Sequence, residues 1–273
     1  MICTPPSFSL FLTCPPDHYG ILYEINPWMD KSRGTNPDLA RHQWDVLCKL
    51  LTEKLGISIE QLSPVAGVPD MVFTANAGLV VGQRFFMSRF RHDVRQGECA
   101  YYEKWFRARG FQIDVPPPNI YFEGEGDALW VGNRLFLGYP IRTNRAAAPW
   151  LEKKLDVPVY PLELVNPHFY HLDTCFCPLD DERVLYYPNA FSPDAQKIIK
   201  EHIPHPIPIE EADALNFGAN AIVVESNIVV NTGCEALSKT LMEEGFTVHP
   251  IDLSEFIKAG GSAKCLILKV GGA

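Results

Sequence analysis

Residues 73–81 read FTANAGLVV: an aromatic residue, a short polar turn and then an apolar strand. The same order, beginning with an aromatic or histidine residue, recurs in residues 122–131 (FEGEGDALWV), 171–176 (HLDTCF) and 217–224 (FGANAIVV). Residues 263–268 (AKCLIL) form a shorter version. Self-similarity at a nearly constant period is the signature of a repeat architecture. The recurrence of this pattern in five segments therefore predicts a fold of five related units.

One polar residue marks the start of each predicted strand: Asn76, Asp127, Asp173, Asn220 and Cys265, separated by 51, 46, 47 and 45 residues. Four of these strands run through turn-forming residues into a second apolar strand, predicted at 84–90, 134–139, 183–187 and 228–231. Two β-rich runs joined by a short turn are typical of a hairpin.

Helical patterns lie between the hairpins. Asn36 and Pro37 predict an N-cap and a first helical residue, and Ser192 with Pro193 repeats that signal. Residues 234–244 predict a third helix that stops at Gly245. A unit of hairpin, helix and extended segment cannot bury its own apolar faces, so neighbouring units must pack together. The fold class is therefore α/β.

The fifth unit is incomplete, because Ala273 follows its first strand by only a few residues. We expect Phe8–Thr13 and Tyr19–Ile25 to supply the missing strands and to close a ring. In a ring, the five polar residues would point to one shared centre and form an active site. The alternative is that small polar residues mark strand starts in any α/β protein.

The chain has 273 residues, of which 47% are hydrophobic and 21% charged, with a net charge of −9. This length is compatible with two fused halves or with one domain over residues 1–273, the interpretation adopted here. The negative charge argues against nucleic acid and anionic membrane as partners. No apolar run long enough to span a membrane, no signal peptide and no dense cysteine framework is visible, which favours a cytoplasmic protein.

Cys265 is a candidate nucleophile because it follows the flexible Gly260-Gly261-Ser262 run. His171 and Asp173 would share one face of an extended strand, and a cysteine–histidine pair is expected to lower the thiol pKa. A lone cysteine is otherwise a small buried apolar residue. Lys264 would point to the opposite face of the strand from Cys265.

Two further clusters allow other chemistry. Glu123, Glu125 and Asp127 lie in a glycine-rich loop and could bind a cation, or could simply form a solvated acidic turn. His171, Asp173, Cys175 and Cys177 alternate along one segment, but a straight strand spreads four such side chains over about 20 Å, too far for one zinc ion. We therefore predict core thiols and no metal site.

Five short motifs in this order resemble the guanidino-group-modifying enzyme superfamily, the penteins: Phe73-Thr74-Ala75-Asn76, Glu123–Asp127, Arg142-Thr143-Asn144, His171-Leu172-Asp173 and Gly260-Gly261-x-x-x-Cys265. The resemblance runs from about Phe8 to Val270. The superfamily includes arginine deiminase, dimethylarginine dimethylaminohydrolase, amidinotransferases and arginine dihydrolase. It implies a five-bladed α/β propeller with five-fold pseudosymmetry and an active site on the axis.

The resemblance also implies roles for individual residues. Catalytic roles fall to Cys265 as nucleophile, His171 as general acid/base and Glu123, and substrate binding to Asn76, Asp173, Asp127, Arg142 and Phe73. Arg142 resembles the residue that binds the substrate carboxylate. The substrate would be a small cationic guanidino compound, and the implied mechanism needs no cofactor or metal.

Two departures from the family pattern bear on the reaction. Deiminases and dimethylarginine hydrolases carry Asp where this chain has Asn76. Their Glu-Gly-Gly-Asp run is one residue shorter than this one, so Glu123 and Glu125 compete for one role, and we favour Glu123. The asparagine form is most similar to arginine dihydrolases, which convert arginine to ornithine, carbon dioxide and ammonia. A citrulline-forming hydrolase, an amidinotransferase and a non-catalytic binding protein are the alternatives, and the oligomeric state is not predicted.

Overall fold

All four predicted hairpins are present in the computed structural model, which describes residues 10–271. The antiparallel pairs are β3 (Gly78–Val81) with β4 (Arg84–Met87), β6 (Ala128–Val131) with β7 (Arg134–Tyr139), β9 (Phe176–Pro178) with β10 (Arg183–Tyr186), and β12 (Ile222–Val224) with β13 (Asn227–Asn231). Gly82 and Gly132 turn the first two hairpins at a φ of 56°, which glycine adopts without a steric penalty.

A third strand completes each sheet and runs parallel to the second one. These strands are β5 (Gln112–Asp114), β8 (Val159–Glu163), β11 (His205–Pro208) and β14 (Thr247–Ile251). Parallel neighbours need a long crossover. Here the crossovers carry α3 (Cys99–Ala108), α4 (Ala147–Leu155), α5 (Pro193–His202) and α7 (Glu235–Glu243), and the first of them also carries the short helix α2 (Asp93–Gln96). Two more short helices, α6 (Glu211–Leu215) and α8 (Ser254–Ile257), lie outside these crossovers.

The predicted helix starts are confirmed. Asn36 accepts a hydrogen bond from the backbone N–H of Leu39 at the start of α1 (Pro37–Lys49), which continues as a wider turn over Leu50–Lys54. Ser192 caps α5 in the same way. Gly245 follows α7 with a φ of 92°, as expected at a helix C-terminus.

The fifth sheet joins the two ends of the chain. Its order is β15 (Leu268–Val270), β1 (Leu10–Thr13) and β2 (Ser58–Gln61), with β1 antiparallel to β15 and parallel to β2. The prediction for Phe8–Thr13 holds for the described part, and Phe8 itself lies outside the described residues. The strand predicted at 19–25 is wrong: this segment is irregular, because β2, reached through α1, already takes the third place in the sheet.

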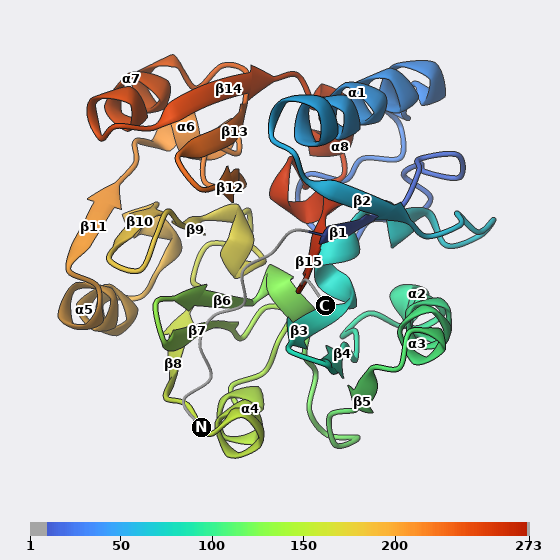
Figure 1. Cartoon of the computed structure of the whole chain (residues 1–273), viewed down its shortest axis with the longest axis horizontal. Coiled ribbons are helices and arrows are strands. Elements are labelled where there is room, and N and C mark those ends of the chain that lie inside the picture. Colours follow the sequence, from blue (N-terminus) through green and yellow to red (C-terminus); the bar gives the residue numbers. More distant parts are fainter. Residues whose placement is uncertain (1–9, 272–273) are drawn as a thin grey trace.

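The five sheets are arranged around a common centre, with the longer helices on the outside (Figure 1). Apolar side chains fill the space between neighbouring sheets. The largest buried cluster joins Phe136, Phe176 and Val230 from the second, third and fourth sheets. Packing between units, predicted from the repeat, is therefore what closes the core. Within residues 10–271, every helix is too short or too polar to cross a membrane.

Candidate active site

The five polar repeat residues lie in turns and not on the strands themselves. Asn76, Asp173 and Cys265 belong to 3₁₀ turns at Thr74–Ala77, Leu172–Thr174 and Lys264–Leu266. Asp127 ends a similar turn, and Asn220 precedes β12. Each residue stands one to three positions before the first strand of its sheet. The expectation that His171 and Asp173 share one face of a strand is therefore wrong, because Asp173 lies in a 3₁₀ turn and His171 directly precedes it.

Hydrogen bonds from these side chains tie successive turns together. The backbone N–H of Leu172 donates to Asp127 Oδ1 at 3.0 Å. Asn220 Nδ2 donates to the Asp173 carbonyl at 2.9 Å, while Asn220 Oδ1 accepts from the backbone N–H groups of Ser262 and Cys265. At Asp127 and Asn220 the shared polar position thus has a structural function, since these two side chains hold neighbouring turns in contact.

The sulfur of Cys265 is buried between an amide and a carboxylate. Asn220 Nδ2 donates to Sγ at 3.1 Å, and Sγ lies 3.3 Å from Asp173 Oδ2. Burial and the nearby Asp173 carboxylate raise the pKa of Cys265 well above its usual value. The expected lowering of this pKa by a histidine partner is wrong, because the imidazole of His171 is bonded elsewhere. In the unliganded site the sulfur is a thiol.

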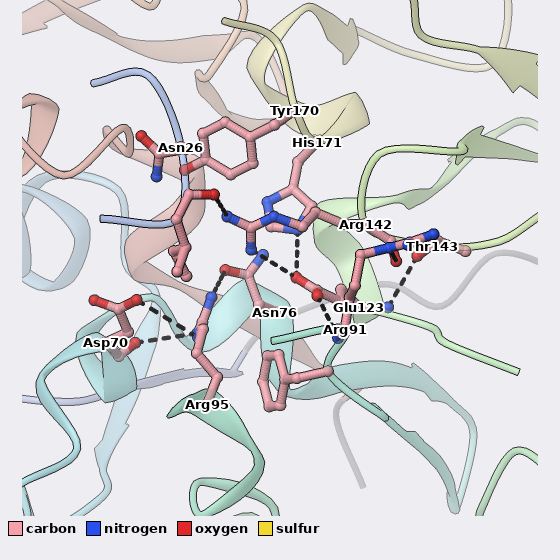
Figure 2. A network of polar contacts seen from close by, with 12 residues as sticks. Asn26, Asp70, Asn76, Arg91, Arg95, Glu123, Arg142, Thr143, Tyr170 and His171 are labelled. Carbon is pink, nitrogen blue, oxygen red and sulfur yellow. Dashed lines mark hydrogen bonds and ion pairs between the residues drawn. The ribbon is translucent and has the colours of Figure 1, made fainter. Parts of the chain in front are cut away.

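His171 forms a buried pair with Glu123. Its Nε2 lies 2.7 Å from Glu123 Oε2, which also accepts from Arg142 Nη1 at 3.2 Å (Figure 2). The other carboxylate oxygen accepts from the backbone N–H of Arg91 at 3.0 Å. Glu125 instead bonds Lys264 Nζ at 2.8 Å. The structure thus brings Glu123, and not Glu125, to His171.

The protonation of this pair follows from its surroundings. Burial alone would raise the pKa of Glu123, but Arg142 and His171 hold it well below its usual range. Burial lowers the pKa of His171 to about 4, against the opposing effect of Glu123. The imidazole is therefore neutral, and Nε2 carries the hydrogen because an ionised carboxylate only accepts. Nδ1 has no partner among the described residues, which leaves a lone pair for proton transfer.

The other predicted residues fall around this centre. Phe73 is buried against the backbone beside Cys265: a Cβ atom on Gly261 would lie 2.5 Å from its ring, so only glycine fits there. Asp127 is fully buried, and burial raises its pKa well above the usual value. Cys175 and Cys177 lie in the apolar core and not beside Asp173 in a ligand set.

Sequence reasoning missed a buried ion cluster beside Asn76. Arg95 Nη1 donates to Asn76 Oδ1 at 2.9 Å, and the same guanidinium lies 3.7 Å from Asp70 (Figure 2). It also donates to Glu98 at 2.6 Å. Asn76 Nδ2 and Asp70 Oδ1 have no partner within the described part of the chain. Asp70 gives a weak sequence signal, as a lone acid in the run Pro69-Asp70-Met71-Val72, whereas Arg95 occupies no repeat position.

Comparison with known proteins gives three informative matches. The family model for eukaryotic N,N-dimethylarginine dimethylhydrolases matches residues 24–271. AgrE of Nostoc sp., a bifunctional arginine dihydrolase/ornithine cyclodeaminase, is 44% identical over 95% of this chain and 37% of its own length. The dimethylarginine dimethylaminohydrolase of Mycobacterium tuberculosis is 38% identical over 97% of this chain and 87% of its own length.

A solved structure extends the comparison to three dimensions. The N-terminal domain of ArgZ, a cyanobacterial arginine dihydrolase, was solved with its substrate as a cysteine-to-serine mutant. It superposes with a TM-score of 0.92 at 43% identity and covers 96% of this chain and 98% of that domain. The present chain thus spans just over a third of the bifunctional AgrE and matches nearly all of this one domain of ArgZ.

Proposed function

This chain belongs to the N,N-dimethylarginine dimethylhydrolase family of the guanidino-group-modifying superfamily, and on that premise we propose that it hydrolyses the guanidino group of L-arginine through Cys265. The products would be ornithine, carbon dioxide and ammonia. One observation carries the proposal. The buried Cys265 thiol lies 3.3 Å from the Asp173 carboxylate, and the His171–Glu123 pair belongs to the same group of turns. We also infer that the five sheets are the blades of a pentein propeller.

The chemistry begins with charge. The Asp173 carboxylate raises the pKa of Cys265, and a guanidinium cation bound beside Asp173 offsets this effect. The pKa of Cys265 therefore falls when substrate binds, and the thiolate can form. His171 Nδ1 takes up the Cys265 proton, the thiolate attacks the guanidinium carbon, and the imidazolium returns this proton to the departing ammonia. An amidino-thioether remains on Cys265. A water molecule that loses its proton to His171 attacks this carbon and releases citrulline and the thiol.

A second round would convert citrulline to ornithine. Cys265 attacks the ureido carbon, ornithine leaves with a proton from His171, and water hydrolyses the S-carbamoyl group to carbamate, which decomposes to carbon dioxide and ammonia. Two water molecules are consumed and two ammonia molecules are released per arginine. This round requires the site to accept a neutral ureido group, which a fully anionic site binds less well.

Asn76 supports the two-round reaction. Because Arg95 donates to its Oδ1, the amide is held with Nδ2 as its free donor. A Cβ atom added to Gly126 would lie 2.3 Å from this nitrogen and 3.3 Å from His171, so the donor faces the imidazole side of the site. An N–H donor suits the carbonyl oxygen of a ureido group, whereas an aspartate at this place would repel it.

The carboxylate end of the substrate is assigned to Arg142, as the family resemblance implies. Its Nη2 donates to the carbonyl of Ile25 at 3.0 Å, and its Nε has no partner among residues 10–271. The guanidinium therefore keeps a donor for an incoming carboxylate. Asp127 and Phe73 keep their assignment as substrate-binding residues.

The assignment of residues 1–273 to one domain also remains a proposal. It is supported by the sheet in which β1, near the start of the chain, pairs with β15, near its end.

The test is a product assay by mass spectrometry. The purified protein is incubated separately with L-arginine, citrulline and asymmetric dimethylarginine. We expect ornithine and two equivalents of ammonia from arginine, and ornithine from citrulline. Citrulline as the final product would instead indicate a deiminase or a methylarginine hydrolase, according to the substrate consumed. Turnover of arginine only with an added amine would indicate amidino transfer, and no turnover would indicate a binding protein.

Replacing Asn76 with aspartate is expected to lower the ornithine-to-citrulline ratio from arginine by at least about tenfold, because leaving one buried hydrogen bond unmade costs about 1–3 kcal/mol. The first round should persist, since its substrate is a cation. The matched control is Asn189→Asp, which makes the same chemical change at an exposed position. An unchanged product ratio in Asn76→Asp would show that the amide does not select the second round.

A further inference from the structure

Glu125 and Lys264 form a buried ion pair that the proposed mechanism does not use. Lys264 Nζ lies 2.8 Å from Glu125 Oε2, and the two side chains are only 7% and 5% exposed. They come from two of the turns that build the active site, the turn at Gly124–Gly126 and the turn at Lys264–Leu266. Burying two charges is costly unless the pair has a function or excellent geometry.

The pair borders a cavity that Cys265 does not line. Both residues line a cavity of about 450 Å³, whose walls include Trp130 of β6 and Val223 of β12. Cys265 and the other predicted catalytic residues are not among the described residues that line this cavity. The ion pair therefore lies at the wall of the cavity, next to the catalytic turn. A different side chain at position 264 can extend into the cavity.

Asp173 is the active-site group that experiences the charge of this pair. The titratable groups that act on it or are affected by it are Lys264, Glu125, Cys265, Asp127, Tyr170, Cys175 and Cys177. Burial raises the pKa of Asp173 to about 7, and among the opposing influences the Lys264 ammonium is the largest. Burial alone would lower the pKa of Lys264, but Glu125 and Asp173 raise it above the usual value, so the ammonium stays charged.

We propose that Lys264 is a positioning residue that keeps the Asp173 carboxylate ionised for the cationic substrate, and that Glu125 holds the Lys264 ammonium in place behind it. The inference rests on the proposed function, in which Asp173 binds a guanidinium. It assigns the Glu-Gly-Glu-Gly-Asp run two separate roles. Glu123 hydrogen-bonds His171 in the active site, and Glu125 hydrogen-bonds Lys264 at the cavity wall.

The first measurement is the pH profile of kcat/KM for arginine. Below a pH of about 7 Asp173 takes up a proton and no longer pairs with the guanidinium, so kcat/KM of the wild type should fall as the pH decreases through that range. In Lys264→Met the pKa of Asp173 rises further, and the acid limb should move up by about one pH unit, a tenfold loss at fixed acidic pH. The loss should appear mainly in KM, and Lys264→Arg should restore the profile.

Variants of Glu125 separate charge from folding. Glu125→Gln removes a nearby anion, so the acid limb should move to lower pH, opposite to the effect of Lys264→Met. Lys264→Met leaves a buried carboxylate without its partner and can fail to fold. The double variant Lys264→Met/Glu125→Gln has no unpaired buried carboxylate at position 125. Its acid limb should still move to higher pH than in the wild type, because Lys264 acts on Asp173 more strongly than Glu125 does. A folded double variant with the wild-type profile would overturn the proposal.

A second readout does not depend on turnover. The rate of alkylation of Cys265 by iodoacetamide at pH 9, followed on its own peptide by mass spectrometry, reports the thiolate fraction. Loss of the neighbouring cation should lower this rate at least about threefold in Lys264→Met, and Lys264→Arg should recover it. If the wild type fails to hydrolyse arginine but these rates follow the prediction, the proposed function is wrong and the electrostatic role of Lys264 stands. Unchanged rates together with an unchanged pH profile would refute the role itself.

Discussion

Replacing Cys265 with serine is expected to reduce arginine turnover by on the order of 10⁴-fold or more, as removal of a catalytic nucleophile does in other hydrolases. A serine hydroxyl stays protonated where a thiol can ionise, so the attack on the guanidinium carbon is lost. Binding should persist, because Asp173 and Arg142 remain in place. Isothermal titration with arginine and a stopped product assay measure the two effects separately.

The same variant tests the covalent intermediate. Acid-quenched wild-type protein incubated with arginine should carry one of two groups on the peptide that contains Cys265: arginine minus ammonia, from the first round, or a carbamoyl group, from the second. The serine variant should carry neither. Cys48→Ser is the matched control, since Cys48 lies partly buried in α1 and takes no part in the catalytic turns. Turnover within tenfold of the wild type in Cys265→Ser would exclude this residue as the nucleophile.

The protonated resting state of Cys265 affects how its reactivity is interpreted. A catalytic thiol is often identified by fast alkylation at neutral pH. Here burial and Asp173 keep the unliganded sulfur protonated, so slow alkylation at pH 7 is compatible with catalysis. Slow alkylation therefore does not by itself favour a binding protein, and the product assay has to decide between the two functions.

Replacing His171 with glutamine is expected to lower kcat by about 10²–10⁴-fold, the usual contribution of a general acid/base. The glutamine amide can still donate to Glu123, so the carboxylate stays satisfied while proton transfer is lost. Thermal unfolding should therefore change little. The measurement is steady-state turnover of arginine and, separately, of citrulline, because both rounds use the same imidazole.

The control for this prediction is His168→Gln, three residues earlier, where the side chain is exposed. Its activity should stay near that of the wild type. Added imidazole should partly restore turnover in His171→Gln if the cavity left by the ring admits it. An active His171→Gln variant would mean that another group, such as Asp173, transfers the proton, and the mechanism would need to be revised.

Local patterns in the sequence were sufficient for most of the fold. Apolar runs joined by turn-forming residues specify the hairpins, and Asn36 and Ser192 specify helix starts, because each signal acts within a few residues. The segment 19–25 has apolar residues spaced like a strand, yet no sheet position is left for it. Whether a strand-like segment pairs depends on the rest of the chain.

The sequence by itself determined the five repeat units and the polar residue that stands at the start of each, because period and spacing are properties of the chain. Only the tertiary structure decided which of them touch. Glu123 and Glu125 are two residues apart, but the 3₁₀ turn between them sends one to His171 and the other to Lys264. The protonation of Cys265 also depends on burial and on Asp173, 92 residues away. Contacts and charge states of this kind arise only when distant turns are packed together. For this reason burial and Asp173 raise the pKa of Cys265, whereas the sequence predicts a pKa lowered by His171.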